Sequence, residues 1–299
     1  MRVLVVNAGS SSVKLRLLGA DDELLGERDI EAPQARVDEQ ALADALAGLD
    51  GVEAVGHRVV HGGERFREAV RIDGDVVAAL RALVDLAPLH QPKSLDALDA
   101  VSHALPGVPA VACFDTAFHA TLPPAAATYP VPAEWRERWA VRRYGFHGLS
   151  HAYAARRAGA ARVVTCHLGA GASLCAVRDG RSVDTTMGFT PLEGLVMATR
   201  SGSVDPGLLL WLLERESVTV REMAEALEHD AGLLALAGTA DMREVLARAS
   251  SATPRNARPS QASSRTGAER SPTPPVNTSA SSPPSAAAIP AIPARSRCR

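Results

Sequence analysis

A strand–loop–strand pattern that occurs twice in the sequence limits the folds open to this chain. The apolar run Val3–Val6 is followed by the small polar stretch Asn7–Ser12 and by a second apolar run, Val13–Leu18. The segment Arg162–Cys175 repeats this order of apolar run, small-residue loop and apolar run. An internal repeat of this kind indicates a duplicated domain with a cleft between the copies; two unrelated hairpins are the alternative.

Helical and strand-like patterns alternate through the chain as far as residue 250. Val108–Phe114 has the pattern of a buried strand that ends at Asp115, and Asp179-Gly180 is typical of a tight hairpin turn. Three helices are expected to begin at capping residues, namely Asp75, Ser94 and Ser150. The mixture predicts an α/β fold with many short strands.

The composition changes near residue 250. Residues 251–299 are rich in Ser, Pro, Ala and Arg, contain nine prolines and show almost no periodic apolar face. Such a segment buries too little apolar surface to offset the entropy lost on ordering, so we expect a disordered low-complexity tail. The tail would be a linker or a basic interaction tail. An altered reading frame fits better, because the change in composition falls inside a developing helix rather than at the end of a domain.

Charge and cysteine usage argue against several functional classes. The tail holds seven Arg and one Glu, which leaves 25 basic and 33 acidic side chains in the rest of the chain. An acidic body argues against a nucleic-acid-binding face. The four cysteines form no Cys-x-x-Cys pair, and no apolar run is long enough to cross a bilayer. We find no signal-peptide pattern, so a cytoplasmic protein without a membrane or nucleic-acid partner is expected.

The loop Asn7–Lys14 offers backbone N–H groups, hydroxyls and one Lys, which suits phosphate oxygens. It lacks the spacing of a P-loop, and a plain polar hairpin turn is the alternative. Other chemistry-bearing residues stand in similar small-residue or strand-end settings; they are Arg58, His90, Asp115, His147 and Arg200. Together, cations, histidines and a carboxylate at a strand end fit phosphoryl transfer, in which catalysis is mostly positioning and charge neutralisation.

Taken together, these segments resemble the acetate kinases of the sugar kinase, Hsp70 and actin superfamily. The matches occur in the family's order over roughly the first 249 residues, at Asn7–Lys14, Gly56–Gly63, Leu86–His90, Phe114–His119, Tyr144–His151, Cys166–Gly171, Met187–Gly194, Thr199–Pro206 and Asp241–Arg243. The resemblance implies a duplicated ribonuclease H-like (actin-like ATPase) fold, with two lobes, an interlobe cleft and an incomplete second lobe. The implied parts are a substrate-side lobe over 1–146, a partial nucleotide-side lobe over 147–250 and the tail over 251–299.

The resemblance also implies roles for individual residues. The catalytic residues would be Asp115, His147 and Arg200. The substrate-binding residues would be Arg58, Val60, Leu89, His90, Phe146 and Pro191. The nucleotide contacts would be Ser10, Ser12, Lys14, His167, Leu168, Gly169, Ala170, Gly171, Asp241, Met242 and Arg243. Asn7 would help to place Mg²⁺, with Mn²⁺ as an alternative, and ATP would be the co-substrate.

The implied reaction is reversible, Mg²⁺-dependent transfer of a phosphoryl group from ATP to acetate, which gives acetyl phosphate and ADP in a homodimer. Two departures from the family pattern matter: Ala170 stands where an Asn is usual, and no Gly-Gly-Ile-Gly-Glu-Asn adenosine loop or late Mg-site Glu follows. We therefore expect weak or absent turnover from these 299 residues. The alternatives are a propionate or butyrate kinase and a catalytically inactive kinase fragment.

Overall fold

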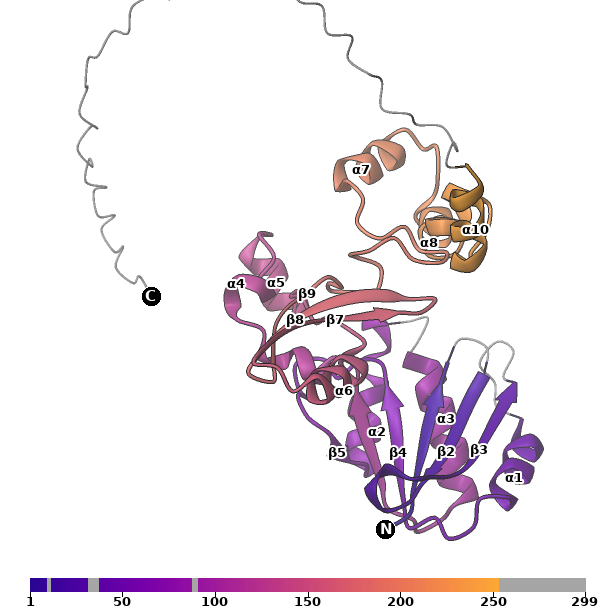
Figure 1. Cartoon of the computed structure of the whole chain (residues 1–299). Coiled ribbons are helices and arrows are strands. Elements are labelled where there is room, and N and C mark those ends of the chain that lie inside the picture. The colour runs from indigo at the N-terminus through magenta and orange to yellow at the C-terminus, as the bar shows by residue number, and fades with distance from the viewer. Residues whose placement is uncertain (10–11, 32–37, 88–90, 253–299) are drawn as a thin grey trace, which may run out of the picture. The chain divides into compact units, whose positions relative to one another are not determined.

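The computed structural model describes residues 1–9, 12–31, 38–87 and 91–252, and these residues belong to one compact unit. They form a mixed α/β structure built on two β-sheets, called sheet A and sheet B below (Figure 1). The expected α/β class is therefore confirmed. The expected domain division after residue 146 stays a prediction.

Sheet A has six strands in the order β3-β2-β1-β4-β6-β5. Strands β1, β4 and β6 run parallel, while β2, β3 and β5 pair antiparallel with their neighbours. The strands are β1 (Val3–Ala8), β2 (Ser12–Leu18), β3 (Leu24–Glu31), β4 (Ala54–Val59), β5 (Val70–Arg71) and β6 (Ala110–Phe114). Because β1, β4 and β6 are parallel neighbours, their carboxyl ends meet at one edge of the sheet, where ligands bind in open α/β folds.

One face of sheet A carries the main apolar core. Along β1 the buried residues alternate with half-buried ones, so Leu4 and Val6 point to the same side. Helices α1 (Glu39–Ala47) and α3 (Gln91–Ala104) cover this side, as Figure 1 shows. The alternation leaves Val5 and Asn7 on the opposite face.

Three expected helix caps are wrong. Helix α2 (Gly74–Arg81) begins after Asp73, whose carboxylate accepts a hydrogen bond from the Val76 N–H, so Asp75 lies in the first turn. Helix α3 begins at Gln91, whose side-chain amide bonds to both backbone groups of His61, which leaves Ser94 buried within the helix. Helix α6 (Gly148–Ala158) begins two residues before Ser150, after His147 in a left-handed conformation.

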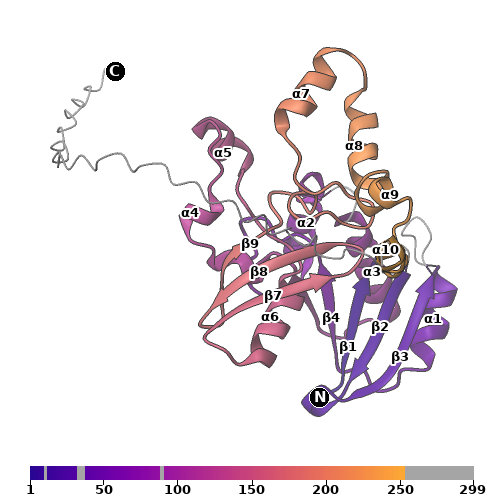
Figure 2. The ribbon, with the colours of Figure 1, turned by 45° about the horizontal axis from the view of Figure 1, so that its top comes forward.

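Sheet B is an antiparallel sheet of three described strands, β7 (Arg162–Leu168), β8 (Ala172–Arg178) and β9 (Arg181–Thr185). Asp179-Gly180 forms the expected turn between β8 and β9, with φ angles of 49° and 73°. Two successive positive φ angles match the twist of a tight hairpin. Helix α6 packs against one face of the sheet through Ala155, Cys175 and Val177 (Figure 2).

The two hairpins that begin the sheets, β1–β2 and β7–β8, show the duplication. In each loop a glycine N–H donates across the turn, from Gly9 to the Ser12 carbonyl at 2.8 Å and from Gly169 to the Gly171 carbonyl at 3.0 Å. The innermost cross-strand pairs are Ala8 with Val13 and Leu168 with Ala172, so the second loop is one residue shorter. The expected duplicated fold is confirmed.

The remaining elements connect or follow the sheets. They are η1 (Ala20–Asp22), η3 (Val84–Leu86), η4 (Ala117–Thr121), α4 (Pro124–Ala127), α5 (Ala133–Trp139), α7 (Pro206–Glu214), α8 (Val220–His229), α9 (Gly232–Ala237) and α10 (Met242–Ala252). Helix α8 starts with a capping box between Thr219 and Glu222. Among the described helices, none has the length and apolar character needed to cross a membrane.

Candidate active site

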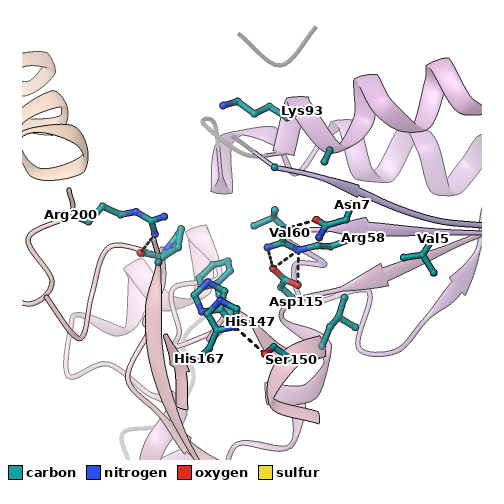
Figure 3. A pocket seen from close by; sticks show the side chains of 16 residues that line it. Val5, Asn7, Arg58, Val60, Lys93, Asp115, His147, Ser150, His167 and Arg200 are labelled. Atoms are coloured by element: carbon teal, nitrogen blue, oxygen red, sulfur yellow. Dashed lines mark hydrogen bonds and ion pairs between the residues drawn. The ribbon is translucent and has the colours of Figure 1, made fainter. Parts of the chain in front are cut away.

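A cavity of about 430 Å³ lies at the carboxyl ends of β1, β4 and β6 and extends to residues of sheet B. This volume is within the usual range for small-ligand sites. Figure 3 shows Asn7, Arg58 and Asp115 on one side and His147, His167 and Arg200 on the other. Ten of the residues predicted for catalysis, substrate, nucleotide or metal binding line it, namely Asn7, Arg58, Val60, Asp115, Phe146, His147, His167, Gly171, Pro191 and Arg200.

Arg58 and Asp115 line the cavity and form an ion pair in which Asp115 is buried and Arg58 is partly exposed. Arg58 follows the alternation of β4, in which Val55 and Val59 enter the core and Arg58 takes the other face. Its Nη2 lies 2.5 Å from Asp115 Oδ2, and its Nε lies 3.1 Å from both carboxylate oxygens. Its Nη1 donates to Asn7 Oδ1 at 3.0 Å. The guanidinium is therefore held in one orientation by two side chains from the neighbouring strands.

The environment keeps Arg58 charged. Burial lowers the pKa of its guanidinium, but the charge and hydrogen bonds of Asp115 outweigh this effect, and the net shift is upward. Asp115 has a side chain only 3% exposed, and both of its oxygens are engaged by Arg58. In this arrangement the carboxylate acts on the cavity through the arginine that it orients.

His147 and His167 stack across the opposite wall, with ring centroids 4.0 Å apart. His147 Nδ1 lies 2.9 Å from Ser173 Oγ, and His167 Nδ1 lies 3.0 Å from Ser150 Oγ. Burial, followed by the nearby His167, Arg58, His151 and Arg200, lowers the pKa of His147 to about 2. His147 is therefore neutral at physiological pH in the ligand-free protein.

Arg200 reaches the cavity from the loop before α7. Its Nη1 donates to the Pro191 carbonyl at 2.8 Å, and its Nε lies 3.9 Å from Glu228 Oε2. Burial lowers the pKa of Arg200, and Glu228 offsets part of that shift. Gly171 makes room for this side chain, because a Cβ there would lie 3.4 Å from Arg200 Nη2 and 3.2 Å from His147 Nε2.

An apolar wall adjoins these charged groups. Val60 and Phe146 are 7% and 1% exposed, and they pack in one cluster with Ala172, Met187 and Met197. Val60, Phe146 and Pro191 all line the cavity. A small apolar group of a ligand would be sheltered there from water.

Several predicted nucleotide contacts do not line the cavity in the described structure. Lys14 is paired with Asn7 across β1 and β2 but is exposed, and Leu168 is 76% exposed. Asp241 pairs with Arg243 at the start of α10. Also away from the cavity lining are Ser12, Gly169, Ala170 and Met242. The predicted residues Ser10, Leu89 and His90 lie outside the described residues.

Some lining residues were missed by the sequence reasoning. Lys93, in the first turn of α3, and Val5, two residues before Asn7 on β1, both line the cavity. Strand alternation could have indicated Val5, because it shares a face with Asn7. Leu149 and Ser150 lie in the first turn of α6 and also line the cavity. Nothing in the sequence distinguished residues that line a cavity from residues that cap this helix.

The duplication places corresponding positions on the same cavity. Asn7 is the second-to-last residue of β1, and His167 is the second-to-last residue of β7. Both line the cavity, so the first strand of each copy directs one polar side chain to it. The cleft expected from the repeat is therefore lined by equivalent strand ends.

Comparison with known proteins identifies the family. The sequence model of the acetokinase family matches residues 31–262. The chain belongs to the acetokinase family. The acetate kinases of Thermoanaerobacter pseudethanolicus and Thermosipho africanus share 40% and 44% identity with this acetokinase over 287 residues, which cover 82% of this chain and 72% and 71% of theirs.

Solved structures of the family have the same fold as this acetokinase. A propionate kinase from Francisella tularensis has a TM-score of 0.78 at 36% identity, over 84% of this chain and 74% of its own. The acetate kinase of Porphyromonas gingivalis has a TM-score of 0.73 at 34% identity, over 84% of this chain and 73% of its own. Family membership thus identifies an ATP-dependent phosphotransferase that uses a divalent metal ion.

The residues at the cavity fit a hydrated Mg²⁺ ion. Among the described residues, no group of three or more His, Cys, Asp or Glu side chains could hold a metal by itself. Mg²⁺ usually keeps several waters and takes only one or two protein oxygens together with substrate phosphates. The Asn7 amide oxygen lines the cavity and accepts one hydrogen bond from Arg58, so its second lone pair is the one that could serve such an ion.

Proposed function

We propose that this acetokinase transfers a phosphoryl group reversibly between ATP and acetate, with Mg²⁺, by direct in-line displacement. The observation that carries the proposal is that Arg58, His147 and Arg200 line one cavity of suitable size. They come from β4, the start of α6 and the loop before α7. Positive and hydrogen-bonding groups thus surround a single space, as phosphoryl transfer requires.

Charge neutralisation is the main task of this site. A carboxylate and the γ-phosphate of ATP repel each other as they approach. In the proposal, Arg58 binds the carboxylate, held in orientation by Asp115, while Arg200 and His147 contact the transferring phosphoryl group. Mg²⁺, held partly by Asn7 and with Mn²⁺ as a substitute, would neutralise charge on the phosphates. A fixed arrangement of such groups needs no covalent enzyme intermediate.

The apolar wall of Val60, Phe146 and Pro191 would receive the methyl group of acetate, next to Leu89 and His90. Propionate is the second candidate substrate, because a propionate kinase is among the similar solved structures. A methylene group changes binding in an apolar pocket by only about 1–3 kcal/mol. Rates measured with acetate, propionate and butyrate at equal concentration distinguish the two candidates.

The nucleotide would bind along sheet B and the small-residue loops. The proposed contacts are Ser10, Ser12, Lys14, His167, Leu168, Gly169, Ala170, Gly171, Asp241, Met242 and Arg243. A residue that does not contact the nucleotide in a structure with bound ATP would be removed from this set.

We also propose a homodimer, which light scattering would test, and a cytoplasmic setting, where ATP is abundant.

The test is a coupled assay of the purified 299-residue protein with acetate, ATP and Mg²⁺. We expect Mg²⁺-dependent formation of acetyl phosphate that Arg58→Ala abolishes and Arg81→Ala, in an exposed ion pair, leaves unchanged. The proposal would be contradicted if the protein showed no turnover and if ATP did not protect it from proteolysis.

A further inference from the structure

Behind His147 lies a chain of hydrogen-bonding groups that the proposed reaction does not use. Ser173 Oγ lies 2.9 Å from His147 Nδ1 and 2.8 Å from His151 Nε2. His151 Nδ1 in turn lies 2.7 Å from Thr165 Oγ1. Ser173, His151 and Thr165 are 0%, 1% and 5% exposed, so water does not compete for these bonds.

The fold places these groups in line. His147 directly precedes α6 and His151 lies in its first turn, and both side chains reach the same Ser173 hydroxyl. Thr165 stands on β7 and Ser173 on β8, where α6 packs against sheet B. Of the four residues, His147 alone lines the cavity in the described structure. The other three can affect a ligand only through His147.

Two directions of the chain give every hydroxyl proton in it an acceptor. A neutral imidazole has one donor and one acceptor nitrogen, and a hydroxyl donates one proton. If Thr165 donates to His151, then His151 donates to Ser173, Ser173 donates to His147 Nδ1, and His147 Nε2 carries a proton. In the reverse direction Thr165 turns to the Cys175 carbonyl, at 3.4 Å, and His147 Nε2 presents a lone pair.

A bound phosphoryl anion selects between the two directions. A lone pair on Nε2 would repel its oxygens, whereas an N–H would donate to them. His147 is kept neutral by burial and by the cations around it, so a donor has to come from the tautomer rather than from added charge. The 3.4 Å contact of Thr165 with the Cys175 carbonyl is long for an O–H···O bond, so the reverse direction gains little from it.

We propose that His151, Ser173 and Thr165 are positioning residues that make His147 present its Nε2–H to a bound phosphoryl group. The inference rests on the proposed function, since it assigns the donor that contacts the transferring group. It extends that function from the cavity to three buried residues with no contact to the substrate.

The first test reads the tautomer directly and needs no turnover. Long-range ¹H–¹⁵N NMR of the full chain with inorganic phosphate should show His147 Nε2 protonated and Nδ1 unprotonated, with His147→Gln used to assign the signals. In Ser173→Ala the Nδ1 loses its donor, and the protonated-Nε2 fraction should fall. Unprotonated Nε2, protonation of both nitrogens, or no response of His147 to phosphate would overturn the proposal.

The second test separates positioning from folding. Ser173→Ala should lower kcat by about 10- to 100-fold, the size of loss that follows when a metal-ligating histidine loses its outer hydrogen-bond partner, with less than about threefold change in KM. Ser182→Ala is the matched control, because Ser182 is equally buried and lies 2.8 Å from His119 Nδ1, away from the cavity lining. Equal losses in both variants would overturn the proposal.

The two tests keep the inference separate from the proposed function. If the wild-type chain has no kinase activity, the kinase proposal fails while the tautomer is still decided by NMR. If Ser173→Ala does not fold, the wild-type spectrum with phosphate alone decides.

Discussion

The Arg58–Asp115 ion pair contributes both to the stability of the fold and to the proposed substrate site. Asp115 is almost fully buried, and among the described residues Arg58 is the one side chain that hydrogen-bonds to its carboxylate. Removing one member of a buried pair leaves an uncompensated charge. The arginine that the substrate would use is therefore also needed to keep a buried carboxylate satisfied.

Arg58→Ala should destabilise the protein as well as abolish substrate binding. Losing one partner of a fully buried pair costs about 3–5 kcal/mol, and the lower end applies here because the Arg58 side chain is 28% exposed. Arg81→Ala breaks an exposed pair with Asp99 and should cost at most about 1 kcal/mol. Urea unfolding of both variants measures the difference, and equal midpoints would contradict the expectation.

Gly171→Ala should impair the site without unfolding the protein. The added methyl would lie within 3.4 Å of both His147 Nε2 and Arg200 Nη2, so these side chains must move. We expect kcat to fall about tenfold or more, since small misplacements of reacting groups are costly. Gly74→Ala, where a Cβ meets nothing within 4 Å, is the control. An unchanged kcat in Gly171→Ala would show that the contact is tolerated.

At the scale of elements, a cluster behind the cavity fixes the loop that carries Pro191. Arg143 Nη1 donates to the carbonyls of Thr185, Thr186 and Met187 at 3.1–3.3 Å, and its Nη2 pairs with Glu193 at 2.7 Å. Tyr129 also bonds to Glu193 and accepts the Phe189 N–H. The Pro191 carbonyl, held by this loop, accepts from Arg200.

Arg143→Ala should therefore loosen the loop over residues 185–194. Hydrogen exchange should speed up there, and KM for the carboxylate should rise, because three carbonyls and Glu193 lose a shared partner. Arg142→Ala removes a 3.4 Å contact to the Arg143 carbonyl and a cation–π contact with Tyr144, but no hydrogen bond to residues 185–194, and serves as the control. Unchanged exchange in that segment would show that Tyr129 and Glu193 hold the loop by themselves.

Strands and their ends were predictable from the sequence, whereas helix starts were not. The alternation in β1 and the apolar run in β6 determine which residues reach the carboxyl edge, so Asn7 and Asp115 could be placed there. Asp73 and Asp75 are equally good caps in isolation, and packing of Val76 and Leu80 decides between them. Ser150 bonds to His167 instead, a contact between distant segments that no local pattern contains.

At the scale of the whole molecule, buried neutral histidines link stability to pH. His57, His61 and His119 are at most 1% exposed, and burial lowers the pKa of each to about 4. Their pKa in an unfolded chain is about 6.5. Between these values the unfolded chain binds protons that the folded protein does not, so stability falls as the pH falls from about 6.5 to about 4.

We expect the melting temperature to drop steeply between pH 6.5 and pH 4.5. Each fully buried histidine contributes up to about 3 kcal/mol to this loss at the acid end. His57→Phe should reduce the pH dependence, because His57 Nε2 is buried without a hydrogen-bond partner among the described residues. His229 is exposed in the last turn of α8, so His229→Phe should leave the pH dependence unchanged. A melting temperature that is flat over this range would contradict the expectation.

The face of sheet B that the described residues leave uncovered has a practical consequence. Leu4 and Ala8 of β1 are buried beneath helices, but Val164 and Leu168, at the corresponding positions of β7, are 62% and 76% exposed. Among the described strands, β7 is also an edge of its sheet. An open strand edge beside exposed aliphatic side chains invites intermolecular β-pairing. Concentrated samples should therefore be prone to aggregation, and colloidal behaviour will limit how this protein can be stored and studied.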